Sequence, residues 1–293
     1  MSSKFFGYIA VILAAAGWAT SGIFVKAIQL GSDISPLALA FWRDLGTAIV
    51  LFVGMFFFRR DKLQIQKRDL WGLAGTGAGL GTFHTFWNLG VFLNGAAVAT
   101  IQQSAMPAIV VIAAWFLWRE PLTWRKIVAV ILTFAGTALV SGVDGVGQLN
   151  LTTSGLLVGI GLPLAYASWN LFGKSVRAKY DAFTVLTYAF AFGALALLPF
   201  QFFVAFPLPV PTISYVWYAG MLVQTIFSFS MYTFGLGRLP ASIASILAMT
   251  EIVFVTIYAY TLLGERLVMM QIIGAALVIG GVLLLVERQK KSG

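Results

Sequence analysis

The chain has 293 residues, of which 60% are hydrophobic and only 10% are charged. An ordinary soluble domain has about a quarter of its residues charged, so this composition excludes a typical water-soluble protein. The sequence contains no cysteine and a single histidine. A disulfide framework and a metal site built on cysteine or several histidines are therefore excluded, and we expect neither a metal ion nor a cofactor.

The net charge of +9 comes from basic residues that flank apolar runs. Basic residues in that position report membrane topology. The sequence therefore predicts a lipid bilayer as the surroundings of the chain and no nucleic-acid partner.

Ten apolar runs follow one another along the chain, and each suits the ~30 Å hydrocarbon layer of a bilayer. The first run continues from Lys4 through Val25, so we expect an uncleaved helix rather than a signal peptide. Pro36 opens the second helix, and Asn94-Gly95 forms the turn after the third. The helices are predicted over residues 5–25, 36–58, 70–93, 96–118, 125–142, 153–173, 182–206, 214–234, 241–263 and 268–286.

The distribution of Lys and Arg predicts the orientation. With the N-terminus in the cytoplasm, sixteen of the nineteen basic residues fall on the cytoplasmic side, and only Lys26 and Arg266 fall on the other. Arg43 alone lies within a span. We therefore expect a multi-pass protein of the bacterial cytoplasmic (inner) membrane with both termini in the cytoplasm.

The chain also repeats itself. Residues 96–100 (AAVAT) followed by 119–122 (REPL) recur as 241–245 (ASIAS) followed by 264–267 (GERL), so that Glu120 and Glu265 stand 145 residues apart. Each unit holds five helices, and an odd number makes the second unit enter the membrane from the opposite side. The predicted fold is an all-α membrane protein of ten transmembrane helices in two inverted five-helix repeats, residues 1–143 and 144–293.

These features resemble the drug/metabolite transporter superfamily with paired EamA-type domains. The resemblance rests on the five-plus-five plan, the small residues opening the fourth helix of each unit and the Glu-centred turns at 118–122 and 263–267. Within the superfamily the chain looks most like YddG-type aromatic amino-acid exporters, by its character around Trp18, His84 and Trp169. One departure is Ile252, where the second unit commonly has a proline matching Pro107, so the sequence does not establish equivalent bends in the fourth and ninth helices.

Polar and aromatic side chains at bilayer depth are the best sequence indication of a transport path. Helix three presents His84, Trp87 and Asn88 on one face, by their i, i+3 and i+4 spacing. Helix six presents Tyr166 and Trp169 after Pro163, a residue that can interrupt a helix. Packing, a tolerated kink or an aromatic belt are the alternative interpretations. The candidate substrate-binding residues are Trp18, His84, Trp87, Asn88, Gln102, Gln103, Tyr166, Trp169, Gln224 and Ser228.

Four ionisable groups lie within spans, and one of them, His84, belongs to this set. Glu251 and His84 are candidates for proton coupling, with a structural hydrogen-bonded role as the alternative for Glu251. Arg43 and Asp44 are adjacent in sequence, so we expect them to point in different directions and not to pair.

Two classes of function fit a polytopic membrane protein, a transporter and an intramembrane enzyme. The sequence shows neither a serine nucleophile in a glycine-framed turn nor a second intramembrane aspartate, so we do not expect an enzyme. A channel is a further alternative. The preferred hypothesis is a monomeric secondary transporter that exports aromatic or other large hydrophobic amino acids by alternating access through a central midplane cavity; the second is a broad-specificity drug or metabolite carrier of the same superfamily.

Overall fold

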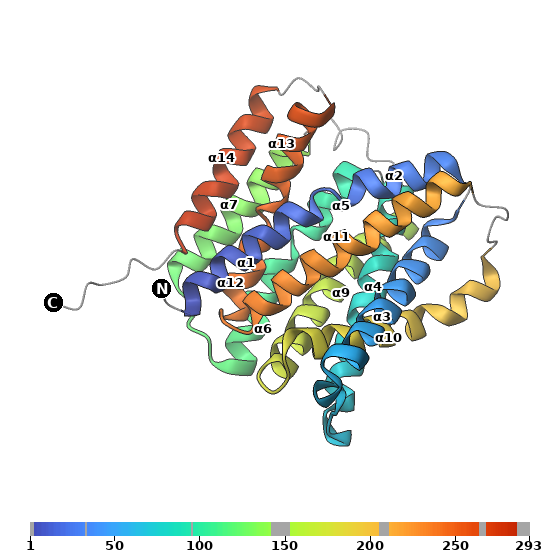
Figure 1. Cartoon of the computed structure of the whole chain (residues 1–293). Coiled ribbons are helices and arrows are strands. Elements are labelled where there is room, and N and C mark those ends of the chain that lie inside the picture. The colour runs from blue at the N-terminus through green and yellow to red at the C-terminus, as the bar shows by residue number, and fades with distance from the viewer. Residues whose placement is uncertain are drawn as a thin grey trace.

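The computed structural model describes residues 3–32, 34–94, 96–141, 153–204, 211–263 and 268–285, and regular structure in these residues is helical (Figure 1). The α-helices of the first half are α1 (Ser3–Trp18), α2 (Ser21–Gly31), α3 (Pro36–Phe58), α4 (Leu70–Asn94), α5 (Ala96–Gln103), α6 (Met106–Trp118) and α7 (Trp124–Val140). Those of the second half are α9 (Thr153–Arg177), α10 (Ala182–Leu197), α11 (Thr212–Leu236), α12 (Ala241–Ala248), α13 (Glu251–Leu263) and α14 (Met269–Leu283). Short 3-10 helices cover Arg60–Leu63, Lys67–Asp69 and Leu198–Phe203.

Seven helical segments of the described chain are long and apolar enough to cross a membrane, namely Ser3–Ile28, Pro36–Phe58, Val98–Trp118, Thr153–Arg177, Ala182–Phe203, Thr212–Leu236 and Ala241–Leu262. With α4, α7 and the shorter apolar α14, they follow the ten predicted helices in order. The all-helical fold is confirmed. The predicted boundary at 143/144 and Glu265 lie outside the described residues, so the division into domains stays a prediction.

Three of the ten passes are interrupted in mid-course: α1 gives way to α2, α5 to α6 and α12 to α13. The breaks fall at residues 19–20, 104–105 and 249–250. The last two breaks are 145 residues apart, the same offset as the repeated motifs. The fourth and ninth passes therefore bend at equivalent positions, although Ile252 replaces the proline that corresponds to Pro107.

A hydroxyl side chain explains why these helices break where they do. In each break a Ser or Thr hydroxyl donates to the carbonyl oxygen three residues earlier: Thr20 to Gly17 (2.8 Å), Ser104 to Ile101 (2.7 Å) and Thr250 to Leu247 (2.8 Å). Such local bonds compete with the backbone ladder of a helix. Pro163, by contrast, lies inside α9, which continues through it although proline has no N–H to donate to the helix ladder.

The pairing of helices follows the inversion of the two units. The first helix of unit one (α1) packs along the third helix of unit two (α11), and the third helix of unit one (α4) packs along the first of unit two (α9) (Figure 1). The second helices, α3 and α10, and the fifth helices, α7 and α14, also pair. A twofold axis that relates the two units exchanges the pair α1–α11 with the pair α9–α4. The same axis relates α3 to α10 and α7 to α14 within their own pairs, as expected for inverted repeats.

Close approach of α4 to its neighbours depends on glycine. A Cβ atom on Gly79 would lie 2.6 Å from the backbone nitrogen of Trp169, and one on Gly81 would lie 2.7 Å from the carbonyl oxygen of Gly193. Small residues at i, i+2 and i+4 thus let α4 contact α9 on one side and α10 on the other, as the glycine pattern of TM helices indicates. This contact sets the depth of Trp169 in the bundle.

Candidate functional site

The three broken helices meet around one cavity of about 320 Å³. Each break supplies residues to its wall: Ala19 from the first, Ser104 from the second and Met249 from the third. Irregular backbone at membrane depth is tolerated where it lines such a space. The wall comprises Trp18, Ala19, Ser21, Gly22, Ile23, Trp87, Thr100, Gln103, Ser104, Thr137, Met249, Glu251, Ile252, Val255, Tyr258 and Ala259.

A second, smaller chamber of about 40 Å³ adjoins this cavity and shares Trp18, Ser21, Trp87, Gln103 and Glu251 with it. Its other wall residues are Arg43, Phe83, His84, Tyr166, Trp169 and Phe229. Hereafter the larger space is the main cavity and the smaller one the inner chamber. The two spaces are lined by seven of the eleven residues considered for substrate or proton binding: Trp18, His84, Trp87, Gln103, Tyr166, Trp169 and Glu251.

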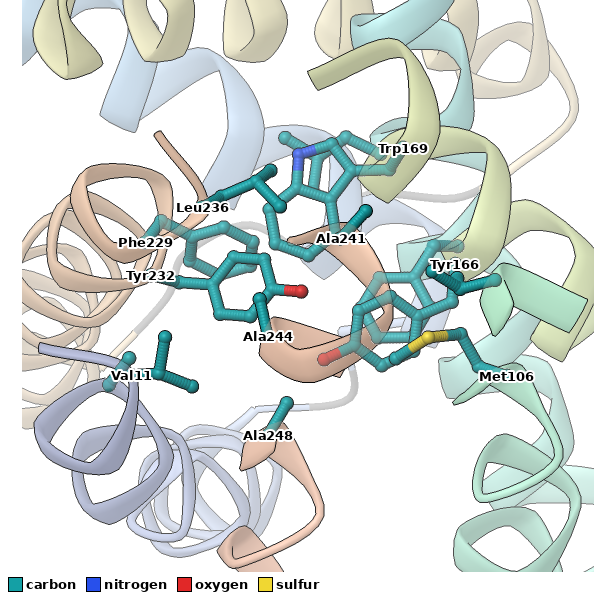
Figure 2. Packing of buried hydrophobic residues seen from close by; sticks show 14 of the residues in the cluster. Val11, Met106, Tyr166, Trp169, Phe229, Tyr232, Leu236, Ala241, Ala244 and Ala248 are labelled. Atoms are coloured by element: carbon teal, nitrogen blue, oxygen red, sulfur yellow. The ribbon is translucent and has the colours of Figure 1, made fainter. Parts of the chain in front are cut away.

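Aromatic rings line part of the inner chamber. Figure 2 shows three of them, Tyr166, Trp169 and Phe229, packed in the core. Trp169 stacks on Tyr166 with ring centroids 5.5 Å apart and contacts Phe229 at 5.2 Å and Trp18 at 6.1 Å. Trp169 and Tyr166 are each only 2% exposed. These rings therefore pack against one another as well as facing the chamber, and they belong to the core of the bundle.

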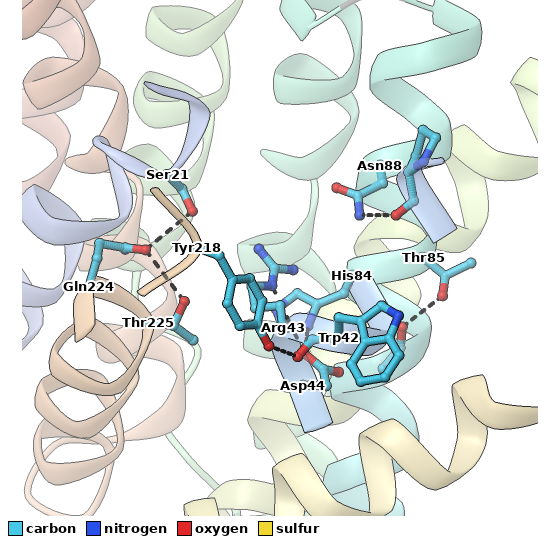
Figure 3. A network of polar contacts seen from close by, with 12 residues as sticks. Ser21, Trp42, Arg43, Asp44, His84, Thr85, Asn88, Tyr218, Gln224 and Thr225 are labelled. Atoms are coloured by element: carbon cyan, nitrogen blue, oxygen red, sulfur yellow. Dashed lines mark hydrogen bonds and ion pairs between the residues drawn. The ribbon is translucent and has the colours of Figure 1, made fainter. Parts of the chain in front are cut away.

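A buried polar group lies beside these rings, where α3 meets α4 (Figure 3). The Nδ1 atom of His84 lies 2.6 Å from Oδ1 of Asp44. An ionised carboxylate can only accept, so His84 Nδ1–H is the donor. Sequence reasoning missed this pair because residues 40 positions apart meet only through helix packing; an aspartate and a histidine at similar depth in neighbouring spans were the available signal.

Arg43 also differs from the expectation. Its Nε atom lies 4.0 Å from Oδ1 of Asp44, so the two charges do pair, at a distance too long for a hydrogen bond. The prediction that these adjacent residues do not pair was wrong because the arginine side chain is long enough to bring its guanidinium near the carboxylate of the next residue. Asp44 thus faces both Arg43 and His84.

Gln224 and Ser228 line neither space. They belong to a hydrogen-bond network at the first helix break. The Gln224 amide nitrogen donates to the carbonyl oxygen of Gly17 at 2.9 Å and to the Ser228 hydroxyl at 3.2 Å. Ser21 donates to the Gln224 amide oxygen at 3.5 Å (Figure 3). The carbonyl group at the end of α1 is therefore satisfied by α11.

Asn88 and Gln102 also lie apart from the two spaces. The Asn88 amide nitrogen donates to the carbonyl oxygen of Pro36 at 2.8 Å, which ties α4 to the start of α3 (Figure 3). Gln102 lies against Gly159 in a separate groove of about 410 Å³ between α5 and α9. The structure does not bring these two side chains to the others.

Several polar atoms near the inner chamber have no hydrogen-bond partner among the described residues. They are Trp18 Nε1, Arg43 Nε and Nη2, Asp44 Oδ2 and Gln103 Oε1. Buried polar groups are normally paired, so each of these atoms is an exception that a ligand could explain. The group includes both donors and acceptors, and three of the four residues that carry them, Trp18, Arg43 and Gln103, line the chamber.

The end of the bundle where α6, α9 and α11 finish is held together by ionic and polar contacts. The Lys174 ammonium donates to the carbonyl oxygens of Leu236 (2.8 Å) and Leu239 (2.5 Å). Arg177 Nε donates to the carbonyl oxygen of Thr233 at 2.9 Å. The distribution of Lys and Arg predicts that these basic residues lie on the cytoplasmic side, whereas the main cavity extends toward the other side along α2, α5 and α13.

Comparison with known proteins gives a consistent family match. The model of the EamA-like transporter family matches residues 5–142 and 153–287. Relatives include an uncharacterized transporter of Archaeoglobus fulgidus, 27% identical over 93% of this chain and 94% of the relative, and the uncharacterized inner membrane transporter YicL of Salmonella typhimurium, 27% identical over 97% and 96%. A probable terminal-alkyne amino-acid exporter of Streptantibioticus cattleyicolor is 27% identical over 95% and 93%. A crystal structure aligns with a TM-score of 0.78 at 18% identity over 97% of this chain and 96% of that one, a likeness of fold.

Proposed function

Because the chain belongs to the EamA-like transporter family, a family of transporters and not of enzymes, we propose that it exports aromatic or other large hydrophobic amino acids across a bacterial inner membrane. One chain acts alone, by alternating access through the main cavity and the inner chamber. The meeting of three broken helices around one cavity is the observation that carries the proposal, because secondary transporters bind their substrates at such breaks near the bilayer midplane.

The chemistry of the two spaces favours a solute with a large apolar part. Trp87, Ile252 and Val255 give the main cavity apolar walls, and Gln103 and Glu251 add polar groups where it meets the inner chamber. A volume of about 320 Å³ lies within the usual range for small-molecule sites. The distant relative named as a probable terminal-alkyne amino-acid exporter supports amino acids as the substrate.

The positions of the contacts favour an outward-open arrangement. Glu120, Lys174 and Arg177 bind partners at the end that carries most of the basic residues. The main cavity lies in the other half, beside Ile23, Thr100 and Ala259. A carrier in this arrangement presents its site to the outside and closes its cytoplasmic side.

Exchange in proteoliposomes tests the proposal. Vesicles that contain only this protein and are preloaded with unlabelled phenylalanine should take up labelled phenylalanine, tryptophan and leucine faster than empty vesicles, and labelled glycine or glutamate no faster. Uptake without acceleration by internal substrate would indicate a channel. Exchange of apolar drugs with no preference for amino acids would favour the broad-specificity carrier.

A cysteine pair tests the orientation, since the natural chain has no cysteine. Both Gln64 and Thr212 are exposed. Gln64 lies in the predicted cytoplasmic loop between helices two and three, and Thr212 lies just before helix eight, on the predicted outer side. A membrane-impermeant thiol reagent applied to intact cells should label Thr212→Cys and leave Gln64→Cys unlabelled until the cells are opened. The reverse pattern would invert the topology and place the closed end outside.

A further inference from the structure

The side chain of Arg43 is a buried cation in the wall of the inner chamber. It is 7% exposed, and neither its Nε nor its Nη2 has a hydrogen-bond partner in the described part of the chain. These two atoms form one edge of the planar guanidinium, and that edge can bind both oxygens of a carboxylate at once. Arg43 thus holds an unused two-point anion site in the wall of the chamber.

Asp44 supplies the counter-charge without occupying that edge. Its Oδ1 accepts from His84 at 2.6 Å and stays 4.0 Å from Arg43 Nε. A buried charge is costly unless another charge compensates it. Asp44 therefore makes a charged arginine tolerable inside the bundle, while His84 holds the aspartate in place.

Glu251 is the acidic residue in the wall of the same chamber. It is the first residue of α13, directly after the third helix break, and it lines both the inner chamber and the main cavity. The first turn of a helix favours a negative charge. Across the described residues Glu251 has no ion pair within 4.0 Å and no hydrogen bond to its carboxylate, so it too is available to a ligand.

The two spaces differ in size and therefore suit different parts of one ligand. An inner chamber of about 40 Å³ is too small for a large side chain but exceeds the ~10–15 Å³ that a single water needs. The main cavity of about 320 Å³ opens from it and is walled by Trp87, Val255 and Tyr258. A small charged head group therefore fits beside Arg43, with its apolar remainder in the main cavity.

We propose that Arg43 and Glu251 bind the two charges of a zwitterionic α-amino acid. The carboxylate occupies the Nε–Nη2 edge of Arg43, and the ammonium group donates to Glu251 and to the unpartnered Oε1 of Gln103. The side chain of the amino acid lies in the main cavity. This inference rests on the proposed function and adds to it that the substrate must carry both charges on adjacent groups.

Three ligands with the same ring separate the two charges. Phenylalanine carries both, phenylalaninamide only the ammonium group, and 3-phenylpropionate only the carboxylate. Their affinities for the purified protein can be measured by isothermal titration calorimetry. Arg43→Gln should weaken binding of phenylalanine and 3-phenylpropionate by about 10- to 100-fold, as expected for a charge-assisted bond, and leave phenylalaninamide within about twofold of the natural protein.

Glu251→Gln should show the converse pattern, with weaker binding of phenylalanine and phenylalaninamide and unchanged binding of 3-phenylpropionate. The double variant Arg43→Gln/Asp44→Asn removes both charges of the buried pair and covers the case in which Arg43→Gln alone fails to fold. Arg60→Gln and Asp61→Asn, which neutralise exposed loop residues, are the matched controls.

Several outcomes would overturn the inference. If either variant binds all three ligands more weakly by the same factor, the residue has a structural role. Unchanged affinities would show that the side chains of Arg43 and Glu251 do not contact the ligand. A Glu251→Gln variant that loses only pH-driven transport, with phenylalaninamide affinity intact, would make Glu251 a proton carrier. If the natural protein binds no amino acid at all, the proposed function itself fails, which distinguishes the two results.

Discussion

The carboxylate of Glu120 accepts a hydrogen bond from the backbone N–H of Ala241, 121 residues away, at 2.8 Å. Glu120 lies in the first of the two repeated turns, and Ala241 is the first residue of α12 in the second unit. The hydroxyl of Ser242 donates to the same carboxylate, and Lys126 Nζ approaches it at 3.3 Å. A turn of the first unit thus caps a helix of the second unit.

This contact predicts that Glu120 stabilises the closed end of the bundle. Glu120→Ala removes a helix cap and leaves the buried Lys126 without its partner, so we expect a loss of about 1–3 kcal/mol in the free energy of unfolding. A cysteine at the buried Ser245, in the same short helix, should then react faster with a thiol reagent. Unchanged stability and reactivity, as for the exposed Asp61→Asn, would show that the cap does not hold this end.

His84 is predicted to hold Asp44. His84→Ala leaves a carboxylate that is 0% exposed without its hydrogen-bond donor, and we expect a loss of about 3 kcal/mol in unfolding free energy. His84→Gln keeps a donor group and should retain more than half of that stability and part of the transport activity. Chemical unfolding of the purified variants provides the measurement, with Thr85→Ala as a control on the same helix. Natural stability in His84→Ala would refute the role.

Trp169 is predicted to act on folding and on substrate binding together. Its ring packs against Trp18, Tyr166, Phe229 and Tyr232, so Trp169→Ala should cost about 3–5 kcal/mol through the cavity it creates. Trp169→Phe should cost less and permit a binding measurement. Trp71→Ala, at a residue 85% exposed, should leave stability unchanged. A fully stable Trp169→Ala variant would mean that the ring does not contribute to the core.

The contacts of Asp69, which lies outside the spans, predict that the stability of the protein depends on pH. Hydrogen bonds from Lys179 and then Tyr180 lower the pKa of its carboxyl group. A lowered pKa in the folded state means that the contribution is present at neutral pH and is lost as the pH falls below about 4. Asp69→Asn should therefore melt at a lower temperature than the natural protein at pH 7, and the difference should shrink toward pH 3. A constant difference across this range would contradict the linkage.

The helix count and the repeat were predictable because they depend on local properties of the chain. Ten apolar runs specify ten helices through their length alone, and the motifs around Glu120 and Glu265 reveal the duplication without any contact being known. The level of Trp18, His84, Gln103 and Glu251 in their spans follows from the 1.5 Å rise of a helix. The sequence by itself therefore determined the fold class and which residues lie near the middle of their spans.

Only the tertiary structure decided which of those residues face one another. The pairing of Asp44 with His84, the support of Gly17 by Gln224 and the separation of Gln102 from Gln103 depend on how helices rotate and pack. The breaks at Thr20, Ser104 and Thr250 likewise required coordinates, because Ser and Thr occur in many helices without breaking them. Contacts between distant segments depend on side-chain packing across several helices at once, which periodicity along one helix does not encode.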